Sequence, residues 1–132
     1  MADTTKFELV SPERLLVSED VEMVVVPGSE GDFGVLKGHA PVISTLRTGT
    51  ISIYAGGAVK DRIFVAGGFA EASADRVTVL ADEAVRVSEI DKPAVKKDLE
   101  TLRAKLGAAT DDGERAGLAA RIDIATAKLA AA

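Results

Sequence analysis

The spacing of apolar residues changes near Ser88, and this change constrains the fold more than any other feature. Before Ser88, apolar residues alternate in short segments, as they do in β-strands with one buried face. The alternating groups are Phe7/Leu9, Leu15/Val17, Val21/Met23/Val25, Ile51/Ile53, Ile63/Val65, Val77/Val79 and Val85/Val87. Turn-forming residues separate them at intervals of roughly 8 to 12 residues, which is typical of an antiparallel sandwich or barrel.

After Ser88 the spacing is helical, with steps of four, three and four residues in two matched stripes. The stripes are Val95/Leu99/Leu102/Leu106 and Leu118/Ile122/Ala125/Leu129. Asp91 and Asp111 precede them as N-cap residues, and Gly107 marks the end of the first helix. The short linker between the stripes predicts an antiparallel helical hairpin.

The predicted fold class is therefore mainly β followed by α. An antiparallel β-sandwich spans residues 1–88, and an antiparallel two-helix hairpin spans residues 89–132. Two segments that are apolar at nearly every position, Met23–Val26 and Ile63–Ala66, are expected to be covered on both faces. A two-helix hairpin covers only part of each stripe, so we expect the hairpin to need a further apolar surface and to be mobile between alternative placements.

Composition excludes several classes of function. The chain has no cysteine and one histidine, His39, which excludes thiol catalysis, disulfides, cysteine zinc sites and multi-histidine sites. Its net charge of -5 argues against binding of nucleic acid or anionic lipid. The longest uncharged stretch, residues 48–59, is shorter than the roughly 18 to 20 residues of a membrane span. We see no export signal, and we expect no metal or cofactor.

The segment from Pro27 to Pro41 is rich in residues with special backbone angles. It holds four glycines and two prolines, and we expect an irregular loop there rather than a strand. Its glycine spacing and its acids, Glu30 and Asp32, argue against a phosphate-binding loop, and calcium-ligand alternation is absent. The residues leave two interpretations open, an ordered loop of the sandwich and an interaction loop.

No catalytic residue is predicted. His39 lies between Gly38 and Ala40 without a nucleophile partner, so we interpret it as a turn or contact residue. The acidic pair Asp82–Glu83 is interpreted as a polar turn between two strands, because adjacent strand residues point to opposite faces. Gly67–Gly68 is expected to mark a bend or a close backbone contact.

Three ordered motifs carry a family resemblance. They are Gly28-Ser29-Glu30-Gly31-Asp32-Phe33-Gly34 with Gly38-His39-Ala40-Pro41, Val65-Ala66-Gly67-Gly68-Phe69-Ala70-Glu71, and Val77-Thr78-Val79-Leu80-Ala81-Asp82. With these motifs the whole chain resembles the epsilon subunit of bacterial F-type ATP synthase.

The resemblance implies a non-catalytic subunit of the rotor stalk. It implies that the sandwich binds the gamma subunit and the ring of c subunits, so that proton-driven rotation reaches the catalytic beta subunits. Glu30 and Asp32 match the family segment that meets the c ring, and His39 matches a residue on the gamma-facing side. The implied location is peripheral, at the cytoplasmic face of the bacterial inner membrane.

The resemblance also implies a regulatory tail that reaches the alpha and beta subunits and hinders ATP hydrolysis. Some members bind ATP through an Ile/Leu-Asp-x-x-Arg-Ala motif at the start of the first helix. Here Asp91 matches the motif, but Ala94 replaces its arginine and removes a planar donor fork suited to phosphate. We therefore expect no nucleotide binding, and we interpret Asp91 as a helix cap.

Two other functions remain open from the residues themselves. One is a free-standing β-sandwich that binds a small ligand or carbohydrate and uses the hairpin to dimerise. It needs aromatic residues on a binding face, and the chain has one Tyr and four Phe. The other is a hydrolase that uses acids and His39, which predicts turnover by the isolated chain.

Overall fold

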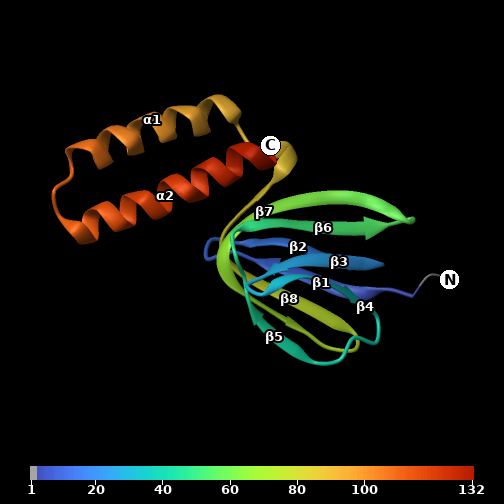
Figure 1. Ribbon diagram of the computed structural model, residues 1–132. Coiled ribbons are helices and arrows are strands. Elements are labelled where there is room, and N and C mark those ends of the chain that lie inside the picture. Colours follow the sequence, from blue (N-terminus) through green and yellow to red (C-terminus); the bar gives the residue numbers. More distant parts are fainter. Residues whose placement is uncertain (1–2) are drawn as a thin grey trace. The chain divides into compact units, whose positions relative to one another are not determined.

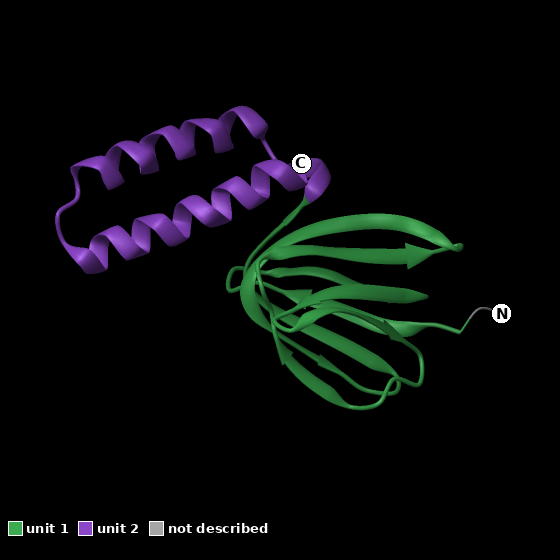
Figure 2. Cartoon of the chain, viewed as in Figure 1, with its two compact units in different colours: residues 1–86 green, residues 87–132 purple. Residues whose placement is uncertain are grey.

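The computed structural model describes residues 3–132, and the chain forms two compact units. The first, called here the sandwich unit, extends to Arg86, and the second, the helical unit, begins at Val87 (Figure 2). The sandwich unit contains only strands, and the helical unit contains a short 3-10 turn and two long helices. Each unit is described separately below.

Eight strands of the sandwich unit form one continuous hydrogen-bonded sheet (Figure 1). They are β1 (Thr5–Val10), β2 (Leu15–Val21), β3 (Met23–Gly28), β4 (Gly31–Leu36), β5 (Val42–Thr45), β6 (Gly49–Ala55), β7 (Ala58–Ala72) and β8 (Arg76–Arg86). The order is β2-β1-β8-β7-β6-β3-β4, and β5 also pairs with β7. The prediction of a β-rich sandwich followed by a helical hairpin is confirmed. One pair, β1 with β8, is parallel rather than antiparallel.

The longest strand, β7, serves two neighbours along one edge. Its first part pairs with β6 and its last four residues pair with β5, while β8 pairs along the opposite edge. Gly67 and Gly68 lie between these parts with φ of 72° and 109°. A Cβ on Gly68 would lie 2.9 Å from the Ala81 Cα, so the two backbones approach closely. Of the two predicted alternatives at these glycines, the close backbone contact is confirmed.

The core of the sandwich unit consists of the alternating apolar residues of seven strands. Its largest fully buried side chains are Phe7, Leu9, Ile51, Ile53 and Ile63. Each such side chain contributes roughly 1.5 to 3 kcal/mol when it is fully buried. All four residues of Ile63–Ala66 are buried, as predicted, whereas in Met23–Val26 only Val24 and Val26 are fully buried.

The prediction of an irregular loop from Pro27 to Pro41 is wrong over most of its length. β3 continues to Gly28, Ser29 and Glu30 form the turn, and β4 begins at Gly31. Proline is tolerated because β3 pairs with β6 only as far as Val25, so Pro27 has no ladder bond to donate on that side. The glycines therefore shape a tight β-hairpin instead of interrupting the strands.

The prediction of a polar turn at Asp82–Glu83 is also wrong. β8 runs through both residues without interruption, and Glu83 pairs with Ala66. The Asp82 side chain occupies the space that a side chain on Gly67 would need. The absence of a side chain at Gly67 therefore leaves room for the acid, and β8 continues past it.

The helical unit is an antiparallel pair of contacting helices. α1 spans Lys92–Ala108 and α2 spans Asp112–Ala131, after the 3-10 turn η1 at Val87–Glu89. The side chains buried in the unit are Val95, Leu99, Leu102 and Leu118, all from the predicted stripes. Neither α1 nor α2 has the length and apolar character of a membrane-spanning helix.

Both predicted N-caps are confirmed. The Asp91 carboxylate accepts a hydrogen bond of 3.1 Å from the Ala94 amide, and that of Asp111 accepts one of 2.9 Å from the Glu114 amide. Across the linker, Arg115 Nη1 donates to the carbonyl oxygens of Leu106 and Ala109 at 2.7 and 3.0 Å. The arginine thereby adds a donor at the C-terminal end of α1, where the carbonyls lack i+4 partners; the Leu106 oxygen also accepts from the Ala109 amide.

Candidate functional site

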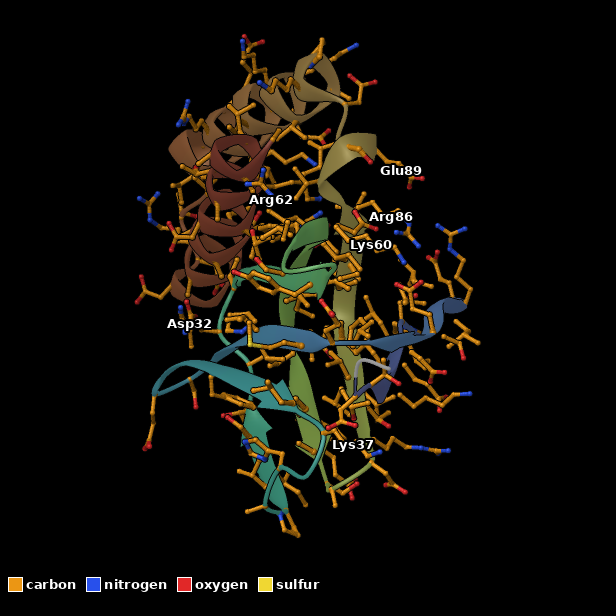
Figure 3. The ribbon with its side chains drawn as sticks, turned by 90° about the vertical axis from the view of Figure 1, so that its right-hand side faces the viewer. Asp32, Lys37, Lys60, Arg62, Arg86 and Glu89 are labelled. Atoms are coloured by element: carbon orange, nitrogen blue, oxygen red, sulfur yellow. The ribbon has the colours of Figure 1, made fainter. Side chains whose placement is uncertain are left out.

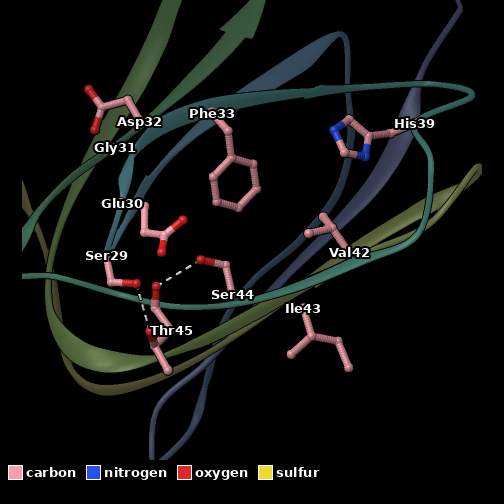
Figure 4. Close-up of a pocket in the computed structure, with 10 residues that line it drawn as sticks. All are labelled: Ser29, Glu30, Gly31, Asp32, Phe33, His39, Val42, Ile43, Ser44 and Thr45. Carbon is pink, nitrogen blue, oxygen red and sulfur yellow. Dashed lines mark hydrogen bonds between the residues drawn. The ribbon is translucent and has the colours of Figure 1, made fainter.

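A hollow of about 680 Å³ lies between the β3–β4 hairpin and strand β5 (Figure 4). Ten residues line it, namely Ser29, Glu30, Gly31, Asp32, Phe33, His39, Val42, Ile43, Ser44 and Thr45. All three candidate contact residues of the sequence analysis, Glu30, Asp32 and His39, are among them. The structure therefore brings together residues that the resemblance assigns to two different partners.

Glu30 and Asp32 occupy different positions on the hairpin. Glu30 is an exposed turn residue, and Figure 4 shows its carboxylate pointing toward the hollow. Asp32 follows two residues later on β4, and in the same view its carboxylate points away from Ser44 and Thr45. The two acids are close in the chain but do not present their charges to the same place.

Arg47, which the sequence analysis did not single out, is the partner of Asp32. Its Nη2 forms an ion pair with the Asp32 carboxylate, and its Nη1 donates to the Gly28 carbonyl oxygen at 2.6 Å. The guanidinium therefore contacts both strands of the hairpin just behind the turn. No sequence signal marks this pairing, because an arginine 15 positions away from an acid follows no local spacing rule.

His39 lies at the opposite end of the hollow from the turn, near Val42 (Figure 4). Its ring is partly exposed, and Nδ1 lies 2.6 Å from the carbonyl oxygen of the adjacent Ala40. This local hydrogen bond agrees with the interpretation of a turn or contact residue. Within residues 3–132, no group of three or more His, Cys, Asp or Glu side chains is arranged to hold a metal ion.

Beside the hollow, apolar side chains lie on the outer face of β5, β7 and β8. Residues in register share a face, which places Thr45, Phe69, Leu80 and Val10 in one row across four strands. Ile43 belongs to the neighbouring row, in which it pairs with the exposed Glu71, and Ile43 is 71% exposed. Phe69 and Leu80 are 43% and 40% exposed, and with Val10 and Pro12 they line a second cavity of about 240 Å³.

This outer face, defined here by Ile43, Phe69 and Leu80, lies outside the core of the sandwich unit. Large apolar patches on a protein surface mark contact sites for other macromolecules. The apolar pattern of the sequence indicated this face only in part. Ile43 was not in any predicted group, and Leu80 came directly after the alternating pair Val77/Val79. The face becomes evident once the register of the strands is known.

An aromatic ligand-binding face is not present in the described part of the chain. Of the aromatic residues there, Phe7 and Phe64 are buried, Phe33 and Tyr54 are partly buried, and Phe69 is exposed. A carbohydrate or small-ligand module needs several exposed rings on one surface. The arrangement favours a macromolecular contact surface over such a module.

In the helical unit, the first turn of α1 is arranged as a helix cap. The Asp91 carboxylate accepts a hydrogen bond from the Ala94 amide. The Ala94 side chain is a methyl group, whereas an arginine at this position would supply a planar set of N–H donors. The caps stabilise the two helices, and no candidate for catalysis lies among these residues.

Comparisons with known proteins agree with this architecture. The family described as "ATP synthase, Delta/Epsilon chain, beta-sandwich domain" matches residues 4–87. The chain is 57% identical to the ATP synthase epsilon chain of Rhodospirillum rubrum over 131 residues, which cover 99% of this chain and 98% of the relative. It is 48% identical to that of Paramagnetospirillum magneticum (strain ATCC 700264 / AMB-1) over 132 residues, 100% of this chain and 98% of the relative.

A solved structure of Euglena gracilis mitochondrial ATP synthase, comprising OSCP, F1 and the c-ring, contains a chain that is similar throughout. The two chains are 30% identical with a TM-score of 0.79, over 97% of this chain and 81% of the other. A chain of the Tetrahymena thermophila mitochondrial enzyme shares the fold with a TM-score of 0.61 at 14% identity, over 95% of this chain and 96% of that one. The chain belongs to the ATP synthase epsilon chain family, the non-catalytic central-stalk subunits of F-type ATP synthase.

Proposed function

We propose that this chain couples rotation of the c-ring to ATP synthesis by joining that ring to the gamma subunit. The observation that carries the proposal is the proximity of two surfaces on one compact sandwich unit. The turn residue Glu30, the outer-face residue Ile43 and His39 all line the hollow beside strand β5. A single small unit can thus hold two partners at once.

The outer face is the proposed gamma contact. Its apolar side chains Ile43, Phe69 and Leu80 are exposed in the isolated chain, and burying them against a partner would stabilise the complex. His39 borders this surface and supplies a polar group at its rim. An apolar centre with a polar rim is the usual anatomy of a stable protein interface.

The hairpin turn is the proposed c-ring contact. Glu30 is exposed on a two-residue turn, Asp32 follows it on β4, and the first 88 residues carry 13 acidic against 8 basic residues. Such a surface attracts cationic groups of a partner, with a strong dependence on salt. This contact would place the chain at the cytoplasmic face of the bacterial inner membrane, as a peripheral part of a proton-translocating complex.

The helical unit is the proposed regulatory part, reaching the alpha and beta subunits. Its helices bury few large side chains between them, and α2 contributes only Leu118 to the buried set among the described residues. Leu106, Ile122 and Leu129 of the predicted stripes stay partly exposed. These apolar side chains could pack against a second surface, and a tail that moves between two placements needs such a surface.

The proposal is tested by charge reversal of Glu30 together with Asp32 in inverted membrane vesicles. We expect reduced ATP-driven proton pumping and an unchanged overall fold, because both side chains are exposed and the loss of an exposed ion pair such as Asp32–Arg47 costs at most about 1 kcal/mol. Asp20→Lys, which changes an exposed acid on the edge strand β2, is the matched control. Unchanged pumping in the double variant would contradict the c-ring contact.

Co-purification tests the complex as a whole. The tagged chain should be recovered from detergent-solubilised membranes with the alpha, beta and gamma subunits. Replacing Ile43 and Phe69 by Asp should reduce recovery of gamma, since two buried charges would be left unpaired. Recovery of the chain alone in the unaltered protein would overturn the proposal.

A further inference from the structure

The two acids of the hairpin differ in whether they form an ion pair with a cation of the same chain. Asp32 is paired with Arg47, whereas Glu30 projects from the turn toward the hollow. Both acids are exposed, and Figure 3 shows Asp32 at the edge of the sandwich unit. Their exposure alone would suggest the same role for both acids. Their ion pairing separates them, because only Asp32 is paired with Arg47.

Arg47 belongs to a set of contacts that ties the hairpin to residues 45–47. Its backbone amide donates to the Pro27 carbonyl oxygen at 3.0 Å, and the Ser29 amide donates to the Thr45 carbonyl oxygen at 2.9 Å. The Thr45 hydroxyl also donates to the Ser29 hydroxyl oxygen at 2.8 Å. The residues that precede Glu30, Pro27 and Ser29, are thus held by residues 45–47.

The guanidinium completes this set because it reaches both strands. One nitrogen contacts Gly28 at the end of β3 and another contacts Asp32 on β4, so the planar fork spans the hairpin behind its turn. Lysine could not reproduce this geometry, since its ammonium is a single point of charge. A Cβ at Gly28 would lie 2.8 Å from the Gly31 carbonyl oxygen and 2.9 Å from the Phe33 ring, so the hairpin needs glycine at this position.

We propose that Arg47 is a positioning residue that neutralises Asp32 and fixes the hairpin turn, leaving Glu30 as the single carboxylate of the hairpin that binds a cationic group of the partner. This inference rests on the proposed c-ring contact. It divides the two acids into one that stabilises the hairpin and one that recognises the partner. It also assigns a role to an arginine outside the motifs that carry the family resemblance.

The first half of the test uses the free full-length chain and hydrogen exchange. In Arg47→Gln and in Asp32→Asn, exchange of the amides at Ser29 and at position 47 should rise about two- to five-fold, the range for an exposed ion pair. The double variant should exchange no faster than the single ones, because both changes break one interaction. Glu30→Gln should leave these amides unchanged, and so should Arg62→Gln, which removes an exposed arginine of β7.

The second half measures how salt changes binding to membranes stripped of this subunit, with restored ATP-driven proton pumping as the readout. The salt dependence should become shallower in Glu30→Gln and stay unchanged in Asp32→Asn. It should become steeper in Arg47→Gln, which exposes a second carboxylate, and return to the unaltered value when Asp32→Asn is added. Arg47→Lys should keep the unaltered salt dependence, because it retains the charge, while protecting the Ser29 amide less well.

Two results would overturn the inference. One is a salt dependence that becomes as shallow in Asp32→Asn as in Glu30→Gln, which would make Asp32 a direct contact. The other is unchanged exchange at Ser29 in Arg47→Gln. Failure of the unaltered chain to rebind and restore pumping would instead contradict the proposed c-ring contact. The hydrogen-exchange results on the free chain would still test the role of Arg47.

Discussion

Asp61 on β7 forms an ion pair with Arg86, the last residue of β8 and of the sandwich unit. Another nitrogen of the same guanidinium lies 3.4 Å from the Leu16 carbonyl oxygen on β2. The side chains of Arg86 and Asp61 are 33% and 24% exposed, so water shields the pair only in part. One arginine thus ties three strands together where the sandwich unit ends.

Arg86→Gln should lower the free energy of unfolding of the sandwich unit by about 1 to 2 kcal/mol, between the values for exposed ion pairs and for charged hydrogen bonds. Urea denaturation of the full chain measures this loss. Asp61→Asn and the double variant complete a cycle in which the losses should not add. Strict additivity would show that the two side chains do not stabilise each other.

Gly68→Ala should destabilise the sandwich unit by at least about 2 kcal/mol, since it adds backbone strain and overpacking at one position. The new methyl group would meet the backbone of Leu80 and Ala81, and φ at this position is 109°. Gly57→Ala is the matched control, with φ of 77° and no atom within 4 Å of the added Cβ. It should cost only about 1 kcal/mol from backbone strain. Equal losses of thermal stability would contradict the steric explanation.

Thr5→Val should stabilise the sandwich unit by about 1 kcal/mol, because it removes a buried hydroxyl that lacks a hydrogen bond. The Thr5 side chain is 1% exposed, and its Oγ1 has no partner among residues 3–132. Thr4→Val, at the exposed neighbouring position, should change the unfolding free energy by less than about 0.5 kcal/mol. A destabilised Thr5→Val variant would reveal a partner for the hydroxyl in solution.

Asp91→Ala and Asp111→Ala should each weaken one helix start, by about 0.5 to 2 kcal/mol per cap. The Ala94 and Glu114 amides donate hydrogen bonds to these carboxylates. Faster hydrogen exchange of each amide therefore reports the loss of its cap. Asp98→Ala, in the exposed middle of α1, should leave both amides unchanged. Each cap variant should affect its own amide, and equal effects on both would contradict local capping.

Titration with ATP should give no saturable heat in the unaltered chain, because Ala94 supplies no cation to a phosphate. Ala94→Arg should gain weak saturable binding, since the position is exposed and an arginine fits there without burial. Ala104→Arg adds the same charge elsewhere on α1 and should gain none. Clear binding by the unaltered chain would show that the arginine is not needed.

Features that depend on near neighbours in the chain could be predicted from the sequence. The helix caps at Asp91 and Asp111, the two helical stripes and the buried segment Ile63–Ala66 all follow from residues a few positions apart. The hairpin at Pro27–Leu36 was missed because its glycines and proline were interpreted as interruptions. In the structure Gly28 and Gly31 lie at strand ends, Gly34 pairs with Val25 inside β4, and Pro27 needs no ladder bond toward β6. Composition indicated an irregular loop in a segment where strand pairing forms a hairpin.

Features that depend on register could not be predicted in the same way. The pairing of Thr45 with Phe69 and of Phe69 with Leu80 creates the outer face, and no spacing rule links these positions. The partners of Asp32 and Asp61 are 15 and 25 positions away in the chain. Asp32 could thus be identified as a candidate from the sequence, whereas Arg47, the cation that pairs with it, becomes visible only in the fold.

The parallel pair of β1 with β8 has a consequence for how the chain folds during synthesis. Lys6 pairs with Arg76 and Val10 with Leu80, so the inner edge of β1 has no partner until nearly all of the sandwich unit has left the ribosome. Closing a loop of this length is entropically costly, and domains rich in such distant pairings fold slowly. A chain released before β8 would expose the unpaired edge of β1 and be prone to aggregation. The helical unit, made last, can begin to form from its own local contacts while the strands are still pairing.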